Sequence, residues 1–135
     1  MISIIIPTYR RPHLLKRAIA SAISQTIEEH TALEVIVVDD DPASMALSAI
    51  AEVFPISENI IFKYIKTAAG LNGTAHARNS ALKAAEGEWV VFLDDDDCLL
   101  PNGVDKMLSA AKTNGSHFCA GNFLTVTENA EGVET

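Results

Sequence analysis

Short apolar runs alternate with amphipathic segments along the whole chain. Strands are expected at these runs, which are Ile2–Ile6, Leu33–Val38, Asn59–Lys66, Trp89–Leu93 and a last one near Ser116–Thr127. Apolar residues at helical spacing follow Pro12, Pro42, Thr74 and Pro101, so a helix is expected after each of the first four strands. Because strands and helices alternate, the pattern predicts βαβ units with a mostly parallel sheet and helices on both faces.

The predicted fold is therefore α/β, a Rossmann-like three-layer α/β/α sandwich. A chain of 135 residues can form one domain with a core of its own. We assign residues 1–127 to this domain and the polar residues 128–135 to a tail that frays. Five consecutive apolar residues at Trp89–Leu93 predict a strand buried on both faces, whereas the mixed pattern of Asn59–Lys66 predicts an edge or near-edge strand.

Two of the predicted strands are followed directly by aspartates. Asp39, Asp40 and Asp41 follow the second strand, and four aspartates, 94–97, follow Trp89–Leu93. Open parallel sheets bind ligands at the carboxyl ends of their strands, so both clusters are expected at one ligand-binding edge. Their charges repel one another, and Mn²⁺ or Mg²⁺ shared with substrate phosphates is the simplest counter-charge. The alternative for the second cluster is a solvated acidic turn.

The two clusters are expected to differ in their roles. Asp39, directly after its strand, is the predicted ligand contact. Asp41 is expected to cap the helix that Pro42 opens, with Met45 facing inward. Further along, Gly70 and Gly73 permit positive φ and close backbone approach, although neither GxxxxGK nor GxGxxG is present.

The net charge of −8, with no basic stripe, argues against nucleic acid as a partner. The first apolar run is too short to cross a bilayer and has no charged leader, so we expect neither a membrane span nor a signal peptide. We expect a cytoplasmic location, with the inner face of the membrane as the alternative for a full-length protein.

Four blocks of the sequence strongly resemble the nucleotide-sugar-binding half of family 2 glycosyltransferases, which are inverting enzymes with a GT-A fold. The blocks, in order, are SIIIPTYRRPHLLKRAIASAISQT, EVIVVDDDPAS, GTAHARNSALKAAEGEW and VVFLDDDDCLLP. The resemblance runs from Ile2 to about Phe123. It implies a truncated GT-A domain that binds a nucleotide-sugar, expected to be a UDP-sugar, through Mn²⁺ or Mg²⁺. The acceptor in the full enzyme would be a saccharide or glycolipid.

The resemblance also implies roles for particular residues. Nucleotide contacts are expected from Pro7, Thr8, Tyr9, Arg10, Asp39, Gly73, Arg78 and Asp95. Asp39 would accept the imide N–H of uracil, Asp95 would lie near the ribose, and Asp94 and Asp96 would bind the metal as a DxD pair. Arg10 departs from the family pattern, which has Asn at this position. For Arg78, an ordinary ion pair with one of the aspartates stands beside ligand binding.

An inverting transferase also needs a carboxylate base that deprotonates the acceptor. In the family this base lies well beyond the acidic turn. After Asp105 the chain offers only Glu128, Glu131 and Glu134, none in a recognisable acceptor motif. We therefore expect a donor-binding module whose catalytic base is not in this chain.

Two other functions are alternatives for this sequence. The first is a non-catalytic nucleotide-binding module, which the missing base favours. The second is metal-dependent phosphoryl transfer, as in haloacid dehalogenase phosphatases or receiver domains. Cys98 stands where such phosphatases carry Thr or Val, and the last predicted strand lacks the lysine of a receiver domain.

Overall fold

The computed structural model describes residues 1–28, 31–53, 57–67 and 73–127. The chain divides into two compact units, residues 1–105 and 106–135. The predicted domain bounds of 1–127 stay a prediction. Gly70 and the tail 128–135 lie outside the described residues.

The first unit holds a four-stranded sheet in the order β3-β2-β1-β4, with every neighbouring pair parallel. The elements, in chain order, are β1 (Ile2–Thr8), α1 (Pro12–Ile23), β2 (Leu33–Asp39), α2 (Ala46–Val53), β3 (Ile60–Lys66), α3 (Gly73–Ala84), β4 (Trp89–Phe92) and α4 (Gly103–Thr113). The predicted α/β class and the parallel sheet are confirmed. None of the described helices is long and apolar enough to span a bilayer.

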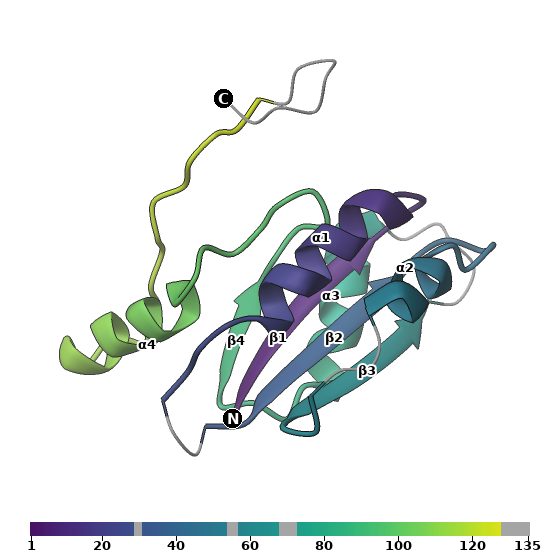
Figure 1. Ribbon diagram of the computed structural model, residues 1–135. Helices are drawn as coiled ribbons and strands as arrows, with labels where there is room; N and C mark the ends of the chain where they lie inside the picture. The colour runs from purple at the N-terminus through teal and green to yellow at the C-terminus, as the bar shows by residue number, and fades with distance from the viewer. Residues whose placement is uncertain (29–30, 54–56, 68–72, 128–135) are drawn as a thin grey trace. The chain divides into compact units, whose positions relative to one another are not determined.

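Helices cover both faces of the sheet, so the predicted three layers are confirmed. Figure 1 shows α1 and α2 on one face and α3 on the other. All residues of β1 and β2 are buried, as expected of central strands between two helical layers. On the α3 side, Ile5, Ile36 and Val38 pack against Ala77 and Ala81, whose small side chains let the helix lie close to the sheet.

The prediction that Trp89–Leu93 is buried on both faces was wrong. β4 pairs only with β1 among the described strands, its residues are partly exposed, and Phe92 is 47% exposed. An apolar run shows that a strand is at least half-buried, but its place in the sheet depends on crossovers that the run does not encode.

The prediction of a last strand near Ser116–Thr127 was also wrong. Residues 117–127 have no regular secondary structure, and Phe118 and Phe123 are 79% and 86% exposed. Apolar content alone does not make a strand, because a strand exists only where another strand pairs with its backbone. No described strand pairs with this segment.

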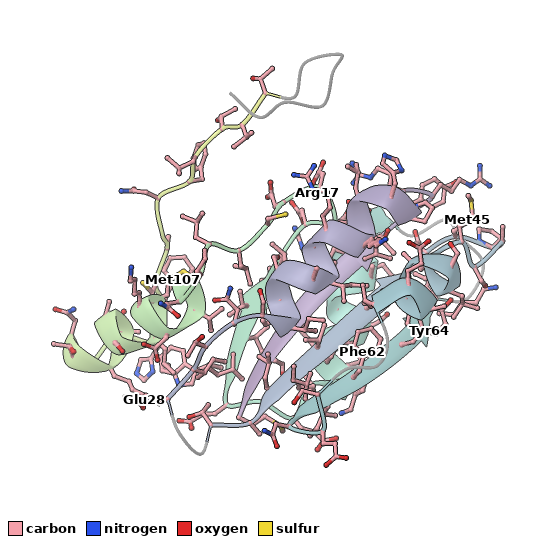
Figure 2. The ribbon with its side chains drawn as sticks, in the orientation of Figure 1. Arg17, Glu28, Met45, Phe62, Tyr64 and Met107 are labelled. Carbon is pink, nitrogen blue, oxygen red and sulfur yellow. The ribbon has the colours of Figure 1, made fainter. Side chains whose placement is uncertain are left out.

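The helix after β2 begins at Ala46 rather than at Pro42. The carboxylate of Asp39 accepts hydrogen bonds from the backbone N–H groups of Asp41 and Ala46, and Asp41 accepts one from Ala43. These bonds hold the segment in a turn before the helix, which is the usual competition of Asp side chains with helical backbone bonds. Met45 therefore lies outside α2 and is 43% exposed, against the expectation that it faces inward (Figure 2).

A buried polar cluster closes the end of the sheet opposite the aspartates. The carboxylate of Glu34 is fully buried, pairs with the Lys63 ammonium at 2.5 Å, and accepts hydrogen bonds from the Ser3 hydroxyl and the Glu86 N–H. A Cβ at Gly87 would lie 2.5 Å from the Ser3 hydroxyl oxygen, so only glycine fits there. The cluster ties the end of α3 to β1, β2 and β3.

Candidate functional site

The winding of the chain reverses at β1. The chain passes from β1 outward to β3 and then returns to place β4 on the other side of β1. The carboxyl ends of β1 and β4 therefore flank a topological switch point, where open parallel sheets form their ligand crevices. The loop after β1 and the aspartates after β4 come from these two strand ends, as the sequence predicts.

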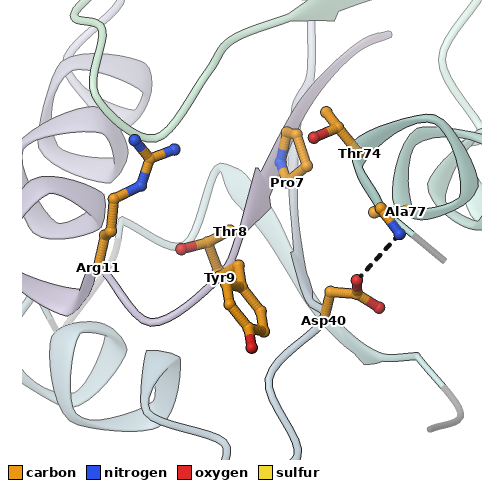
Figure 3. Close-up of a pocket in the computed structure, with 8 residues that line it drawn as sticks. Pro7, Thr8, Tyr9, Arg11, Asp40, Thr74 and Ala77 are labelled. Atoms are coloured by element: carbon orange, nitrogen blue, oxygen red, sulfur yellow. Dashed lines mark hydrogen bonds between the residues drawn. The ribbon is translucent and has the colours of Figure 1, made fainter. Parts of the chain in front are cut away.

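A pocket of about 410 Å³ opens at this edge of the sheet. Its lining residues are Pro7, Thr8, Tyr9, Arg11, Asp40, Gly73, Thr74 and Ala77 (Figure 3). The volume is in the range of small-molecule sites in proteins. Pro7, Thr8, Tyr9 and Gly73 were predicted from the sequence, and Gly73 has the expected positive φ of 69°.

The Tyr9 side chain is half exposed at the pocket, and the Arg10 guanidinium lies over its ring. The Arg10 guanidinium lies 5.0 Å from the centre of the Tyr9 ring and pairs with Asp41 at 3.2 Å. Burial would raise the pKa of Asp41, but the Ala43 N–H and Arg10 outweigh it and the pKa is lowered. Arg10 therefore contacts the loop and Asp41, and it is not among the residues that line the pocket.

Asp39 and Asp40 point in different directions. The Asp39 carboxylate is fully buried. It accepts a hydrogen bond from the Tyr64 hydroxyl at 3.1 Å, in addition to those from the backbone N–H groups of Asp41 and Ala46. Asp40 lines the pocket, where it accepts the Thr67 hydroxyl and the Gly73 N–H, the latter at 3.3 Å and drawn as the dashed line in Figure 3. The carboxylate that faces the pocket is thus Asp40, which the sequence analysis did not select.

Within the acidic turn, Asp95 is an internal residue. Its side chain is fully buried and accepts the Thr8 hydroxyl at 2.7 Å. The Arg11 guanidinium binds it through two nitrogens, at 2.5 and 3.3 Å. Asp95 therefore joins the turn after β4 to the loop after β1, and the predicted contact of Asp95 with a ribose stays a prediction.

Asp94, Asp96 and Asp97 present carboxylate oxygens that lie within 4.8 Å of one another. Burial, followed by the charges of Asp96 and Asp94, raises the pKa of Asp97. Carboxylate oxygens are hard ligands, so these three converging carboxylates fit a Mg²⁺ or Mn²⁺ ion. Such an ion commonly takes one or two carboxylates and completes its coordination shell with water and phosphate. Asp97 is an addition to the predicted pair.

Two arginines form ion pairs with the acidic turn. The third nitrogen of Arg11 donates to Asp96 at 2.9 Å. Burial would lower the pKa of Arg11, but Asp95 and Asp96 outweigh it and the pKa is raised. Arg78 pairs with Asp94 at 2.5 Å and lies over the Phe92 ring. For Arg78 the structure shows the ion pair that the sequence left open.

Four residues that line the pocket were not predicted from the sequence, namely Asp40, Arg11, Thr74 and Ala77. The sequence did contain an indication for Asp40, because it follows a strand in the same acidic run as Asp39. The indication for Arg11 was weaker, since a cation beside the first loop could pair either with a phosphate or with an aspartate. The pocket roles of Thr74 and Ala77 depend on how α3 packs, and no local pattern reports that.

Residues 3–132 of the chain match the family model described as Glycosyl transferase family 2. One relative is the UDP-Glc:alpha-D-GlcNAc-diphosphoundecaprenol beta-1,3-glucosyltransferase WfgD of Escherichia coli, with 31% identity over 96% of this chain and 48% of the relative. Another is the GalNAc(5)-diNAcBac-PP-undecaprenol beta-1,3-glucosyltransferase of Campylobacter jejuni, with 33% identity over 86% of this chain and 36% of the relative. The chain spans about half the length, or less, of these curated relatives.

Solved structures of similar fold contain nucleotides. The crystal structure of S. aureus TarS 1-349 in complex with UDP-GlcNAc matches with a TM-score of 0.68 and 29% identity, over 84% of this chain and 31% of TarS 1-349. The mannosyltransferase PcManGT from Pyrobaculum calidifontis, in complex with GDP-Man and Mn²⁺, matches with a TM-score of 0.64 and 28% identity, over 82% and 31% of the two chains. These matches confirm the GT-A type of fold predicted from the sequence.

Proposed function

This chain belongs to glycosyltransferase family 2, and on that premise we propose that it is the donor-binding part of an enzyme that transfers a sugar from a nucleotide-sugar. The observation that carries the proposal is the juxtaposition of the pocket with the acidic turn at the switch point. A nucleoside in the pocket would place its diphosphate toward the three convergent carboxylates. The match to a glycosyltransferase family over residues 3–132 favours sugar transfer over the phosphoryl-transfer alternatives.

The proposed nucleotide is a uridine diphosphate. Asp40 keeps acceptor capacity beside its bonds to Thr67 and Gly73, so it can accept the imide N–H of uracil. Tyr9 offers a half-exposed ring against which a base can stack. TarS is solved with UDP and UDP-GlcNAc, which supports this choice, whereas PcManGT is solved with GDP-Man. Guanine also presents N–H donors, so UDP must be compared directly with GDP.

Asp94, Asp96 and Asp97 are the proposed ligands of Mn²⁺ or Mg²⁺. When bound, such an ion stabilises the charge that develops on the departing nucleoside diphosphate. The protein's own part is to hold the acidic turn in place, through Thr8 and Arg11 on Asp95 and Arg78 on Asp94. We propose inversion at the sugar carbon, as the family resemblance implies, with the acceptor deprotonated by a base outside this chain.

The acceptor and the location belong to the whole protein. Two relatives are named for undecaprenol-linked saccharides, which supports a glycolipid or saccharide as the acceptor. We propose a cytoplasmic location, with the inner face of the membrane as the alternative for the full-length protein.

Thermal unfolding with nucleotides tests the proposal. UDP with Mn²⁺ should raise the melting temperature, since a ligand at about 100 times its Kd adds roughly 2.7 kcal/mol of stability. EDTA should remove the shift, and GDP or ADP should give a smaller one. Equal stabilisation by UDP with EDTA would refute the metal role of the acidic turn, and no stabilisation by any nucleotide would refute the donor site itself.

A further inference from the structure

Arg11 lies where the pocket meets the acidic turn. It lines the pocket and, in addition, uses three nitrogens on two aspartates of the turn. Two nitrogens bind the fully buried Asp95, which fixes the guanidinium at that end. The third nitrogen binds Asp96, whose side chain is 48% exposed. Arg11 thus pairs with one buried carboxylate, that of Asp95, and with one carboxylate that is open to solvent, that of Asp96.

Asp96 is also one of the three carboxylates that can converge on a metal ion. A divalent cation and the Arg11 guanidinium would therefore compete for the same carboxylate. The charges in the turn support such an exchange, because the turn carries four carboxylates and, in the part of the chain that the structure describes, its ion pairs are with two guanidinium groups, those of Arg11 and Arg78. The remaining two negative charges match one divalent cation.

A bound diphosphate changes this balance again. It adds negative charge beside the metal, at the side of the turn that faces the pocket. A planar guanidinium that Asp95 holds through two nitrogens is well suited to bind phosphate oxygens through its third nitrogen, the one that Asp96 would release.

We propose that Arg11 is a diphosphate-binding residue of the donor site and that it exchanges Asp96 for the diphosphate when metal and nucleotide bind. The inference rests on the proposed donor site. In the ligand-free protein Arg11 holds the place of a cation on Asp96, and so it weakens the binding of metal alone. In the complete complex it contacts the phosphate, and so it strengthens the binding of nucleotide with metal.

The test compares the Arg11→Gln and Arg11→Lys variants with the unchanged chain by calorimetry. Three affinities are measured: Mn²⁺ alone, UDP with saturating Mn²⁺, and uridine with saturating Mn²⁺. Lys16→Gln is the matched control, because Lys16 is a cation of α1, the helix that begins directly after Arg11, but it pairs with Glu52 and does not line the pocket. Circular dichroism and melting curves report whether each variant is folded.

Arg11→Gln should bind Mn²⁺ alone about fivefold more tightly and UDP with Mn²⁺ about tenfold more weakly. Uridine, which has no phosphate, should bind unchanged. Arg11→Lys keeps the charge but cannot span the carboxylates of Asp95 and Asp96. Its affinity for UDP should therefore lie between that of the unchanged chain and that of Arg11→Gln. A purely structural role would weaken Mn²⁺, UDP and uridine together, and that result would overturn the proposal.

Other outcomes separate this proposal from the donor site. If the unchanged chain binds UDP with Mn²⁺ and Arg11→Gln does the same with equal affinity, Arg11 is not a diphosphate ligand and the donor site stands. If the unchanged chain binds neither Mn²⁺ nor UDP, both the donor site and the role of Arg11 are refuted.

Discussion

Asp39 and Asp40 follow the same strand, yet their surroundings give them different tasks. Asp39 is buried and bonded to three donors from the turn and from β3, so it holds the entrance of α2. Asp40 is directed to the pocket. The alternation of side chains along an extended backbone separates them, because neighbouring residues point to opposite faces.

Substitution of Asp40 should therefore affect mainly ligand binding, and substitution of Asp39 mainly the stability of the fold. Asp40→Asn should weaken UDP binding about tenfold or more, since a hydrogen bond to a charged acceptor contributes roughly 1.5–3 kcal/mol. Asp39→Asn should lower the free energy of unfolding by about 1–3 kcal/mol, because it leaves buried donors unpaired. Urea denaturation and UDP titration of both variants measure the two effects. A loss of UDP affinity in Asp39→Asn alone, with its stability intact, would return the base contact to Asp39.

At the scale of elements, the two ends of the sheet are built differently. The carboxyl end carries the pocket and the acidic turn, in which Asp94 and Asp96 are partly exposed and each pairs with an arginine. The opposite end carries the Glu34 cluster, where one buried carboxylate ties β2 to β1, β3 and the segment after α3. The candidate site lies at one end and the anchoring of α3 at the other.

The Glu34 cluster should make stability depend on acid pH. Burial would raise the pKa of Glu34, but hydrogen bonds from Lys63, Ser3 and the Glu86 N–H outweigh it and the pKa is lowered from 4.5. A carboxyl group with a depressed folded-state pKa stabilises the protein above its unfolded pKa, and this contribution is lost as pH falls through the folded pKa.

Glu34→Gln should thus reduce the free energy of unfolding by about 1–3 kcal/mol near pH 7. Its difference from the unchanged chain should shrink as pH falls below 4.5. Urea denaturation between about pH 3 and pH 7 measures this. Glu52→Gln is the control, because Glu52 forms an exposed pair with Lys16, and such pairs contribute about 0–1 kcal/mol. A difference that does not change with pH would show that Glu34 is not ionised in the fold.

At the scale of the molecule, donor binding and sugar transfer need different parts of an enzyme. The described residues supply a pocket and the acidic turn that is proposed to bind a metal ion. Deprotonation of an acceptor needs a base within hydrogen-bond reach, and the sequence offers none in a recognisable acceptor motif. The relatives, of which this chain spans about half or less, have further residues that could supply one.

The 135-residue chain alone should therefore bind UDP-sugars without glycosylating an acceptor. Slow hydrolysis of the donor is expected, because water needs less positioning than a sugar hydroxyl. Released UDP and glycosylated product are measured together, with UDP-sugars, Mn²⁺ and candidate acceptors. Efficient product formation would mean that a base lies among the acidic residues after the turn, at Asp105, Glu128, Glu131 or Glu134.

The sequence by itself determined the order of the first four strands and of the helices that follow them, the start of α1 at Pro12 and the placing of both acidic clusters at one edge of the sheet. These features follow from local periodicity, from the fixed φ of proline and from the rule that parallel strands end at the same edge. Four sequence blocks in order were also enough to indicate the family, which the family match over residues 3–132 confirms.

Only the tertiary structure decided which side chains meet. Arg11 and Asp95 are 84 residues apart, and so no local pattern could pair them. The edge position of β4 depends on where the last crossover lands, and the pocket role of Asp40 depends on the packing of α3 against β1 and β2. The apolar residues of 116–127 form no strand because pairing needs a partner backbone, which composition does not supply. Periodicity reports how one segment is buried, whereas contacts between segments are determined by how the whole chain packs.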